Sequence, residues 1–211
     1  MSENLHKDWT GNGNSIWKTL GASNHTEKER EADDYYATDG IAIDKLIKVE
    51  HPNVNIWECA AGGGHLSERL KKFGGNVFSS DIKNRGYTLD KQMDFLLATK
   101  DDIPFSERFD IITNPPYKLA KEFVLKGLDL LPDEYCRLYM FLKLTFLEGK
   151  ARYNEIFSQT PPSKVYVFSE RIMCAKNGEF ERMRESGGSA VAYAWFVWRK
   201  GYTGKTVVEW I

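Results

Sequence analysis

Residues 54–66 read VNIWECAAGGGHL and residues 109–117 read FDIITNPPY. Each stretch begins with a short apolar run, which is typical of a buried strand, and continues into glycines or prolines, which end a strand. Helical spacing follows both of them, over 65–73 and 119–131. Because strands that alternate with helices form parallel sheets, the sequence predicts an α/β fold with a mostly parallel sheet and helices on both faces.

The remainder of the chain continues this alternation. Further strands are expected at 76–80, 135–142, 164–169 and 191–198, with helices at 39–49 and, from the capping box of Thr26 and Glu29, at 26–33. Residues 1–25 are polar and rich in Gly and Asn, so we expect an irregular N-terminal arm. Residues 26–211 are then one domain, without a separate large target-recognition domain.

The composition excludes several classes of protein. Of the 211 residues 42% are hydrophobic and 28% are charged, which is typical of a soluble globular protein. No apolar run reaches the roughly 20 residues that span a bilayer, and the first residues lack the apolar stretch of a secretory signal. Three widely spaced cysteines fit neither a disulfide framework nor a zinc site. We therefore expect a cytoplasmic protein without a metal or a membrane partner.

The net charge of −1 gives no global sign of nucleic-acid binding, but the charges are unevenly distributed. Residues 1–60 carry 6 basic and 11 acidic groups, whereas residues 164–205 carry 8 basic and 4 acidic groups. A local basic patch can meet phosphates even when the total charge is near zero. An ordinary solvated surface explains the same asymmetry equally well.

The glycine-rich loop after the first strand indicates a ligand site. Gly62, Gly63 and Gly64 allow a sharp turn and a close approach to a ligand, and Glu58 at the strand end can accept hydrogen bonds from an amine or hydroxyls. The third glycine of the phosphate fingerprint G-x-G-x-x-G is missing in both frames, which disfavours a pyrophosphate ligand. A tight turn that simply needs glycines is the alternative.

Two further acidic residues suit a nucleoside ligand. Asp81 follows the second strand, where a carboxylate is placed to take both ribose hydroxyls. Asp94 shortly precedes the third strand and can receive an adenine amino group, with Phe95 packed on the ring. Alternatively, Asp81 is only a turn residue, and Asp94 is a surface residue next to Phe95 in the core.

The sharpest signal is Asn114-Pro115-Pro116-Tyr117, directly after a buried strand. Two prolines make a stiff turn. The Asn114 side-chain oxygen and the Pro115 carbonyl can both accept hydrogen bonds from one NH2 group. These two hydrogen bonds favour a tetrahedral nitrogen whose lone pair can attack a sulfonium methyl group in line. The ring of Tyr117 offers a face on which a flat substrate can stack. A Pro-Pro turn that only ends a strand is the alternative.

The order of ECAAGGG (58–64), SSDI (79–82), DFLL (94–97) and TNPPY (113–117) resembles the amino-methyltransferases that use S-adenosylmethionine. The motif order resembles the gamma-type DNA N6-adenine methyltransferases, in particular small phage and prophage members. The resemblance implies a Rossmann-like seven-stranded sheet whose last strand is antiparallel. This sequence departs from the family pattern at Glu58 and Ala60, where Asp and Gly are commoner, and in the absence of a recognition domain of the usual size. The implied cofactor residues are Tyr36, Ala37, Thr38, Glu58, Ala60, Gly62, Gly64, His65, Leu66, Asp81, Ile82, Asp94 and Phe95.

A base in a duplex reaches such a pocket only when it is flipped out, so other residues must hold the nucleic acid. We expect residues 170–188 and 144–153 to do so, with arginines on phosphates and Phe180 on a flipped base; a surface loop of mixed charge is the alternative. The candidates are Lys150, Arg152, Arg171, Lys176, Phe180, Arg182 and Arg184.

Three alternatives remain open. An RNA base or a protein glutamine amide presents the same planar NH2 group as adenine. A non-catalytic module that binds the cofactor is the third alternative. The sequence is compatible with a monomer and with a homodimer.

Overall fold

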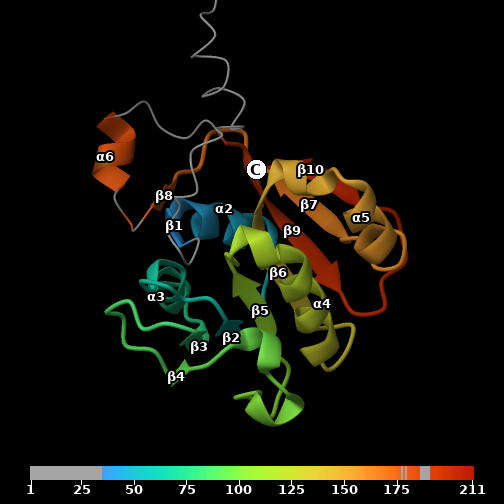
Figure 1. Ribbon diagram of the computed structural model, residues 1–211, viewed down its shortest axis with the longest axis horizontal. Coiled ribbons are helices and arrows are strands. Elements are labelled where there is room, and N and C mark those ends of the chain that lie inside the picture. Colours follow the sequence, from blue (N-terminus) through green and yellow to red (C-terminus); the bar gives the residue numbers. More distant parts are fainter. Residues whose placement is uncertain (1–34, 177, 179, 186–190) are drawn as a thin grey trace, which may run out of the picture.

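The computed structural model describes residues 35–176, 178, 180–185 and 191–211 (Figure 1). The expected arm over 1–25 and the expected helix over 26–33 lie outside this part. The strands are β1 (Tyr36–Thr38), β2 (Asn55–Glu58), β3 (Asn76–Asp81), β4 (Lys91–Gln92), β5 (Asp110–Thr113), β6 (Arg137–Lys143), β7 (Lys164–Val167), β8 (Cys174–Lys176), β9 (Tyr193–Arg199) and β10 (Val207–Trp210). The helices are α2 (Ile41–Val49), α3 (His65–Lys72), α4 (Ala120–Leu130), α5 (Lys150–Arg152) and α6 (Phe180–Glu185).

The main sheet has the strand order β10-β7-β9-β6-β5-β2-β3-β4. Strand β9 is antiparallel to both of its neighbours, and the other pairs are parallel. The prediction of a mostly parallel, Rossmann-like sheet is therefore confirmed. The expected count of seven strands is wrong, because β10 adds an eighth strand at the edge, parallel to β7. The antiparallel strand is thus the last but one in the chain.

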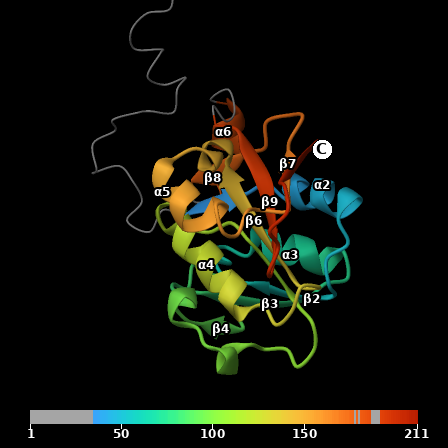
Figure 2. The same ribbon diagram turned by 90° about the vertical axis from the view of Figure 1, so that its right-hand side faces the viewer.

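Alternating side chains of the central strands fill two hydrophobic cores. In β6, Leu138 and Met140 belong to one core, whereas Tyr139 and Phe141 belong to the other. Successive side chains of a strand point to opposite faces of a sheet, so each face needs its own cover. Figure 2 shows α4 and α5 on one side of the sheet and α2 and α3 on the other. The predicted three-layer arrangement follows from this double burial.

A separate two-stranded sheet joins two distant segments of the chain. Strand β1 pairs antiparallel with β8, with Thr38 opposite Cys174. The Asp39 amide also donates a hydrogen bond to the Met173 carbonyl at 3.1 Å. The segment between β7 and β9 is therefore folded against β1 and contains the helix α6. Within the described ranges, no helix is long and apolar enough to cross a bilayer.

Candidate active site

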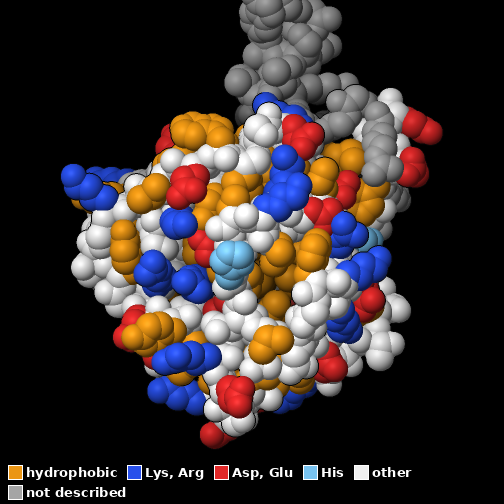
Figure 3. All heavy atoms as spheres, turned by 180° about the vertical axis from the view of Figure 1, so that it is seen from behind, with side chains coloured by type: hydrophobic (Ala, Val, Ile, Leu, Met, Phe, Trp, Pro, Cys, Tyr) orange, Lys and Arg blue, Asp and Glu red, His pale blue; other side chains and the backbone are white. Residues whose placement is uncertain are grey.

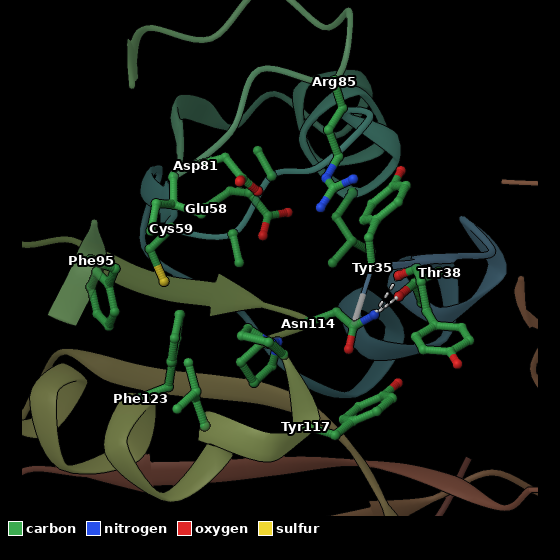
Figure 4. A pocket seen from close by; sticks show the side chains of 18 of the residues that line it. Tyr35, Thr38, Glu58, Cys59, Asp81, Arg85, Phe95, Asn114, Tyr117 and Phe123 are labelled. Atoms are coloured by element: carbon green, nitrogen blue, oxygen red, sulfur yellow. Dashed lines mark hydrogen bonds between the residues drawn. The ribbon is translucent and has the colours of Figure 1, made fainter. Parts of the chain in front are cut away.

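The predicted site residues meet at the carboxyl ends of the parallel strands. Strand β2 ends at Glu58, β3 ends at Asp81, and β5 leads directly into Asn114. Ligands of open α/β sheets bind at this edge, where the strand order reverses between β2 and β5. The edge is hollowed into a cavity that is open to solvent (Figure 4). Its lining includes Tyr36, Ala37, Thr38, Glu58, Ala60, His65, Leu66, Asp81, Ile82, Asp94, Phe95, Asn114, Pro115, Pro116 and Tyr117.

The Asn114 amide has one defined orientation. Its nitrogen donates hydrogen bonds to the Tyr36 carbonyl and to the Thr38 hydroxyl, each at 2.9 Å. A carbonyl only accepts hydrogen bonds, so the amide nitrogen must face Tyr36. The amide oxygen Oδ1 is buried and has no hydrogen-bond partner within the described part of the chain. It points away from Thr38, on the side of Tyr117 (Figure 4). Since buried polar atoms are normally paired, this oxygen is placed for a donor from a ligand.

The proline corner after β5 leaves one carbonyl as the second candidate acceptor. The Pro116 carbonyl accepts a hydrogen bond from the Leu119 amide at 2.9 Å, within the turn that starts α4. It is therefore already engaged in the local fold. The Pro115 carbonyl is predicted from the sequence to accept a hydrogen bond from a substrate amine, and Pro115 lines the cavity together with Asn114.

Tyr117 belongs to a cluster of aromatic rings. Its centroid lies 6.2 Å from that of Tyr36 and 5.9 Å from that of Tyr193, with interplanar angles of 27° and 30°. The Lys143 ammonium lies 4.9 Å from the ring centroid, and the hydroxyl contacts Cys174 Sγ at 3.2 Å. Burial holds the pKa of Tyr117 well above its usual value, so the phenol stays neutral. The expected stacking on a flat substrate stays a prediction.

Glu58 is a buried carboxyl with one free oxygen. Oε1 accepts a hydrogen bond from the Thr113 hydroxyl at 2.7 Å, whereas Oε2 is buried and has no partner among residues 35–176, 178, 180–185 and 191–211. Burial, with a smaller contribution from the charge of Asp81, raises the pKa of Glu58 to about 8. An uncompensated carboxylate in this position is costly. A cation in the cavity would favour the ionised form.

Asp81 shapes the glycine-rich loop. Its carboxylate accepts hydrogen bonds from the Gly62 amide at 2.8 Å and from the Lys83 amide at 2.9 Å. Gly62 and Gly64 have φ angles of 54° and 78°, in the left-handed region that glycine adopts without strain. The loop therefore needs these glycines, and each Asp81 oxygen keeps a second lone pair for a ligand hydroxyl.

Tyr35 and Arg85 line the cavity but were not singled out from the sequence. The Tyr35 hydroxyl accepts a hydrogen bond from the Gly63 amide at 2.8 Å, and a Cβ on Gly62 would lie 2.1 Å from the Tyr35 ring. The Arg85 guanidinium lies 4.5 Å from the Tyr35 ring centroid, on the side of Glu58 (Figure 4). Tyr35 directly precedes the predicted cofactor residues Tyr36, Ala37 and Thr38, whereas no sequence signal pointed to Arg85.

The candidate residues for an adenine ring lie at the other end of the cavity. Asp94 Oδ1 accepts a hydrogen bond from the Leu96 amide at 2.9 Å and so caps a short 3-10 helix. Phe95 is 2% exposed and packs edge-on against Trp57 at 5.4 Å, so it is both core and cavity wall. Ile82 is 59% exposed, at the rim.

The expected nucleic-acid residues whose side chains the structure describes lie outside the cavity lining. The Arg152 guanidinium donates to the carbonyls of Phe146, Thr145 and Glu148 and so caps the preceding turn. Phe180 packs edge-on against His65, with the ring centroids 5.6 Å apart, and therefore lies next to the glycine-rich loop.

The remaining candidate cations lie on three other elements. Lys150 begins α5, and Arg171 is exposed beside a second hollow. Lys176 belongs to β8, and Arg182 and Arg184 belong to α6, but their side chains lie outside the described part. From behind, basic side chains lie scattered among acidic ones (Figure 3). Among the described residues, no group of three His, Cys, Asp or Glu side chains could hold a metal ion.

The sequence matches no protein-family model and no curated protein. Solved structures do match. The methyltransferase subunit of a type I restriction-modification system from Streptococcus thermophilus is 15% identical, with a TM-score of 0.54 over 82% of this chain and 46% of that one. A modification subunit of a type I restriction enzyme from Vibrio vulnificus is 13% identical, with a TM-score of 0.57 over 91% of this chain and 49% of that one.

A protein from Agrobacterium tumefaciens, named as a predicted O-methyltransferase, is 14% identical, with a TM-score of 0.52 over 82% of this chain and 84% of that one. This chain therefore spans about half the length of the two restriction-modification subunits and most of the third protein. At these identities the likeness concerns the fold, which this chain shares with proteins named as methyltransferases.

Proposed function

We propose that this protein transfers a methyl group from S-adenosylmethionine to the N6 amino nitrogen of adenine in DNA. The observation that carries the proposal is the Asn114 amide. Its nitrogen is held by Tyr36 and Thr38, and its buried oxygen, beside the cavity, has no partner among the residues that the structure describes. An acceptor fixed in this way suits a planar NH2 group.

The residues of the cavity fit the cofactor. S-adenosylmethionine has a cationic amino group, a ribose and an adenine, and it supplies an activated methyl group on a positively charged sulfur. The free oxygen of Glu58 suits the ammonium, and Asp81 suits the ribose hydroxyls. Asp94 and Phe95 suit the adenine. A Cβ on Gly62 would meet the ring of Tyr35, so the loop packs closely against a side chain that lines the cavity.

The chain acts on the substrate by positioning it. Asn114 Oδ1 and the Pro115 carbonyl accept the two hydrogens of the substrate amine and so orient its lone pair towards the methyl donor. Tyr117 offers a neutral ring for the base. These groups only accept hydrogen bonds or stack, so the acceleration comes from orientation and preorganised dipoles rather than from a strong base.

Two observations favour DNA as the substrate. Two of the fold neighbours are subunits of type I restriction-modification systems. The segment over 164–205 also carries a net positive charge that suits phosphates. This segment would hold the strand from which adenine is flipped, and its Phe180 packs against His65, next to the glycine-rich loop.

The test is a comparison of Asn114→Ala with the wild-type chain. Transfer of tritiated methyl groups to DNA, RNA and protein is measured in parallel, together with the affinity for a cofactor analogue. We expect methylated adenine in DNA, and for the variant at least a 100-fold loss of transfer with an unchanged affinity for the analogue. The matched control is Asn154→Ala, at an exposed position of the short π-helix Tyr153–Phe157.

Three outcomes would contradict the proposal. Near-normal transfer by Asn114→Ala would remove the role of the amide. Transfer to RNA or to a protein glutamine, and not to DNA, would change the substrate. Cofactor binding without transfer to any polymer would indicate a non-catalytic module. Mapping modified bases in cells that lack adenine methylation and express the chain extends the test to a genome.

A further inference from the structure

We infer that Thr38 is a positioning residue for the catalytic amide, and that its hydroxyl sets the orientation of Asn114 for methyl transfer. The inference rests on the proposed function and goes beyond it. The family resemblance placed Thr38 among the residues that contact the cofactor. The hydrogen bond from Asn114 Nδ2 to Thr38 Oγ1 at 2.9 Å gives this hydroxyl a different task.

Both hydrogens of the amide are used by the same short strand. One goes to the Tyr36 carbonyl and the other to the Thr38 hydroxyl, so β1 holds the amide at two points. A rotation by about 180° around the last side-chain bond would place Oδ1 against the Tyr36 carbonyl, with two acceptors facing each other. The two contacts therefore fix which atom of Asn114 the substrate meets.

The strand that carries Thr38 is itself held in place. Thr38 is 2% exposed, and β1 is hydrogen-bonded along β8, with Thr38 opposite Cys174. Cys174 Sγ also lies 3.6 Å from Asn114 Nδ2. The hydroxyl is thus fixed relative to the corner after β5, although 76 residues separate it from Asn114 along the chain.

Removal of the hydroxyl should weaken the orientation without abolishing it. In Thr38→Val the Tyr36 carbonyl still accepts one amide hydrogen, so the wrong orientation stays disfavoured. We expect kcat to fall about 10-fold, because a less well-oriented group loses part of the positioning advantage. The dissociation constant of a cofactor analogue should change less than about 2-fold, and Thr38→Ser, which keeps the hydroxyl, should restore kcat to within about 3-fold of the wild-type value.

The experiment combines kinetics with a spectroscopic readout. Methyl transfer and analogue binding are measured for Thr38→Val, Thr38→Ser and the control Thr206→Val. The control loses a hydroxyl whose hydrogen bond, to the Pro162 carbonyl, is remote from the cavity. In parallel, the side-chain NH2 signal of Asn114, identified by its loss in Asn114→Asp, is followed by NMR. We expect that signal to move in Thr38→Val and to return in Thr38→Ser.

The outcomes separate the inference from the proposed function. An unchanged kcat in Thr38→Val, or an unmoved NH2 signal, would overturn the positioning role. A large loss of analogue affinity would assign Thr38 to the cofactor instead. If the wild-type chain transfers no methyl group, the proposed function fails, while the NMR comparison still decides whether Thr38 orients Asn114.

Discussion

Replacement of Glu58 by Gln should remove a large part of the pH dependence of stability. Burial raises the pKa of Glu58 from 4.5 to about 8 in the folded chain. Between these two values the folded state binds a proton that the unfolded state has released. Stability therefore falls as the pH rises through this window, and the loss is complete above the folded pKa.

The magnitude follows from the two pKa values. Each pH unit inside the window costs about 1.4 kcal/mol, so the ionised side chain destabilises the cofactor-free fold by about 5 kcal/mol above pH 8. Between pH 5.5 and 7.5 the difference amounts to about 3 kcal/mol. Glutamine keeps an oxygen for the Thr113 hydroxyl and carries no charge, so Glu58→Gln lacks this contribution.

The assay is urea unfolding of the cofactor-free wild-type chain and of Glu58→Gln, followed by tryptophan fluorescence at about four pH values between 5 and 9. We expect the free energies of unfolding of the two proteins to diverge with rising pH, in favour of the variant. Glu134→Gln, which changes an exposed carboxylate, should run parallel to the wild type. If the curve for Glu58→Gln is also parallel to that of the wild type, Glu58 ionises normally and the reasoning is refuted.

Three further predictions concern ligand binding and packing. A cationic cofactor should favour the ionised form of Glu58, so cofactor binding near pH 7 should release a proton, and the affinity should rise as the pH rises to about 8. Calorimetry in buffers of different ionisation enthalpy detects the released proton. Gly62→Ala should weaken analogue binding by more than about 10-fold because its Cβ meets the Tyr35 ring, whereas Gly74→Ala, equally left-handed but with nothing within 4 Å of its Cβ, should bind normally. Gly127→Ala should cost about 1 to 3 kcal/mol of stability in thermal unfolding, because its Cβ would lie 2.8 Å from a side chain of β6.

Local patterns were sufficient for the central α/β units. The apolar run before Asn114 forms β5, and the stretches after the two loops form α3 and α4, close to the predicted bounds. Buried parallel strands are short continuous apolar runs, and helices show their period directly, so both leave a strong local signal. The same signal predicted that Glu58, Asp81, Asp94 and Asn114 lie at one edge of the sheet.

Pairing between distant segments left no such signal. Strands β1 and β8 have three residues each and lie more than 130 positions apart, so neither shows a period. Strand β10 was missed because it is an edge strand with an exposed tryptophan, Trp210, which a core pattern does not predict. The roles of Thr38 and Cys174 beside Asn114 depend on these pairings, and the sequence alone therefore could not give them.

The ladder between β1 and β8 makes the chemistry sensitive to a part of the chain that is remote from it in sequence. Strand β1, which orients the Asn114 amide, is hydrogen-bonded to β8 in the segment between β7 and β9. Deletion of that segment would therefore remove the support of the Asn114 amide together with any substrate contacts that the segment makes. Substrate affinity and the rate of methyl transfer would then fall together, and shortening this segment could not change one without the other.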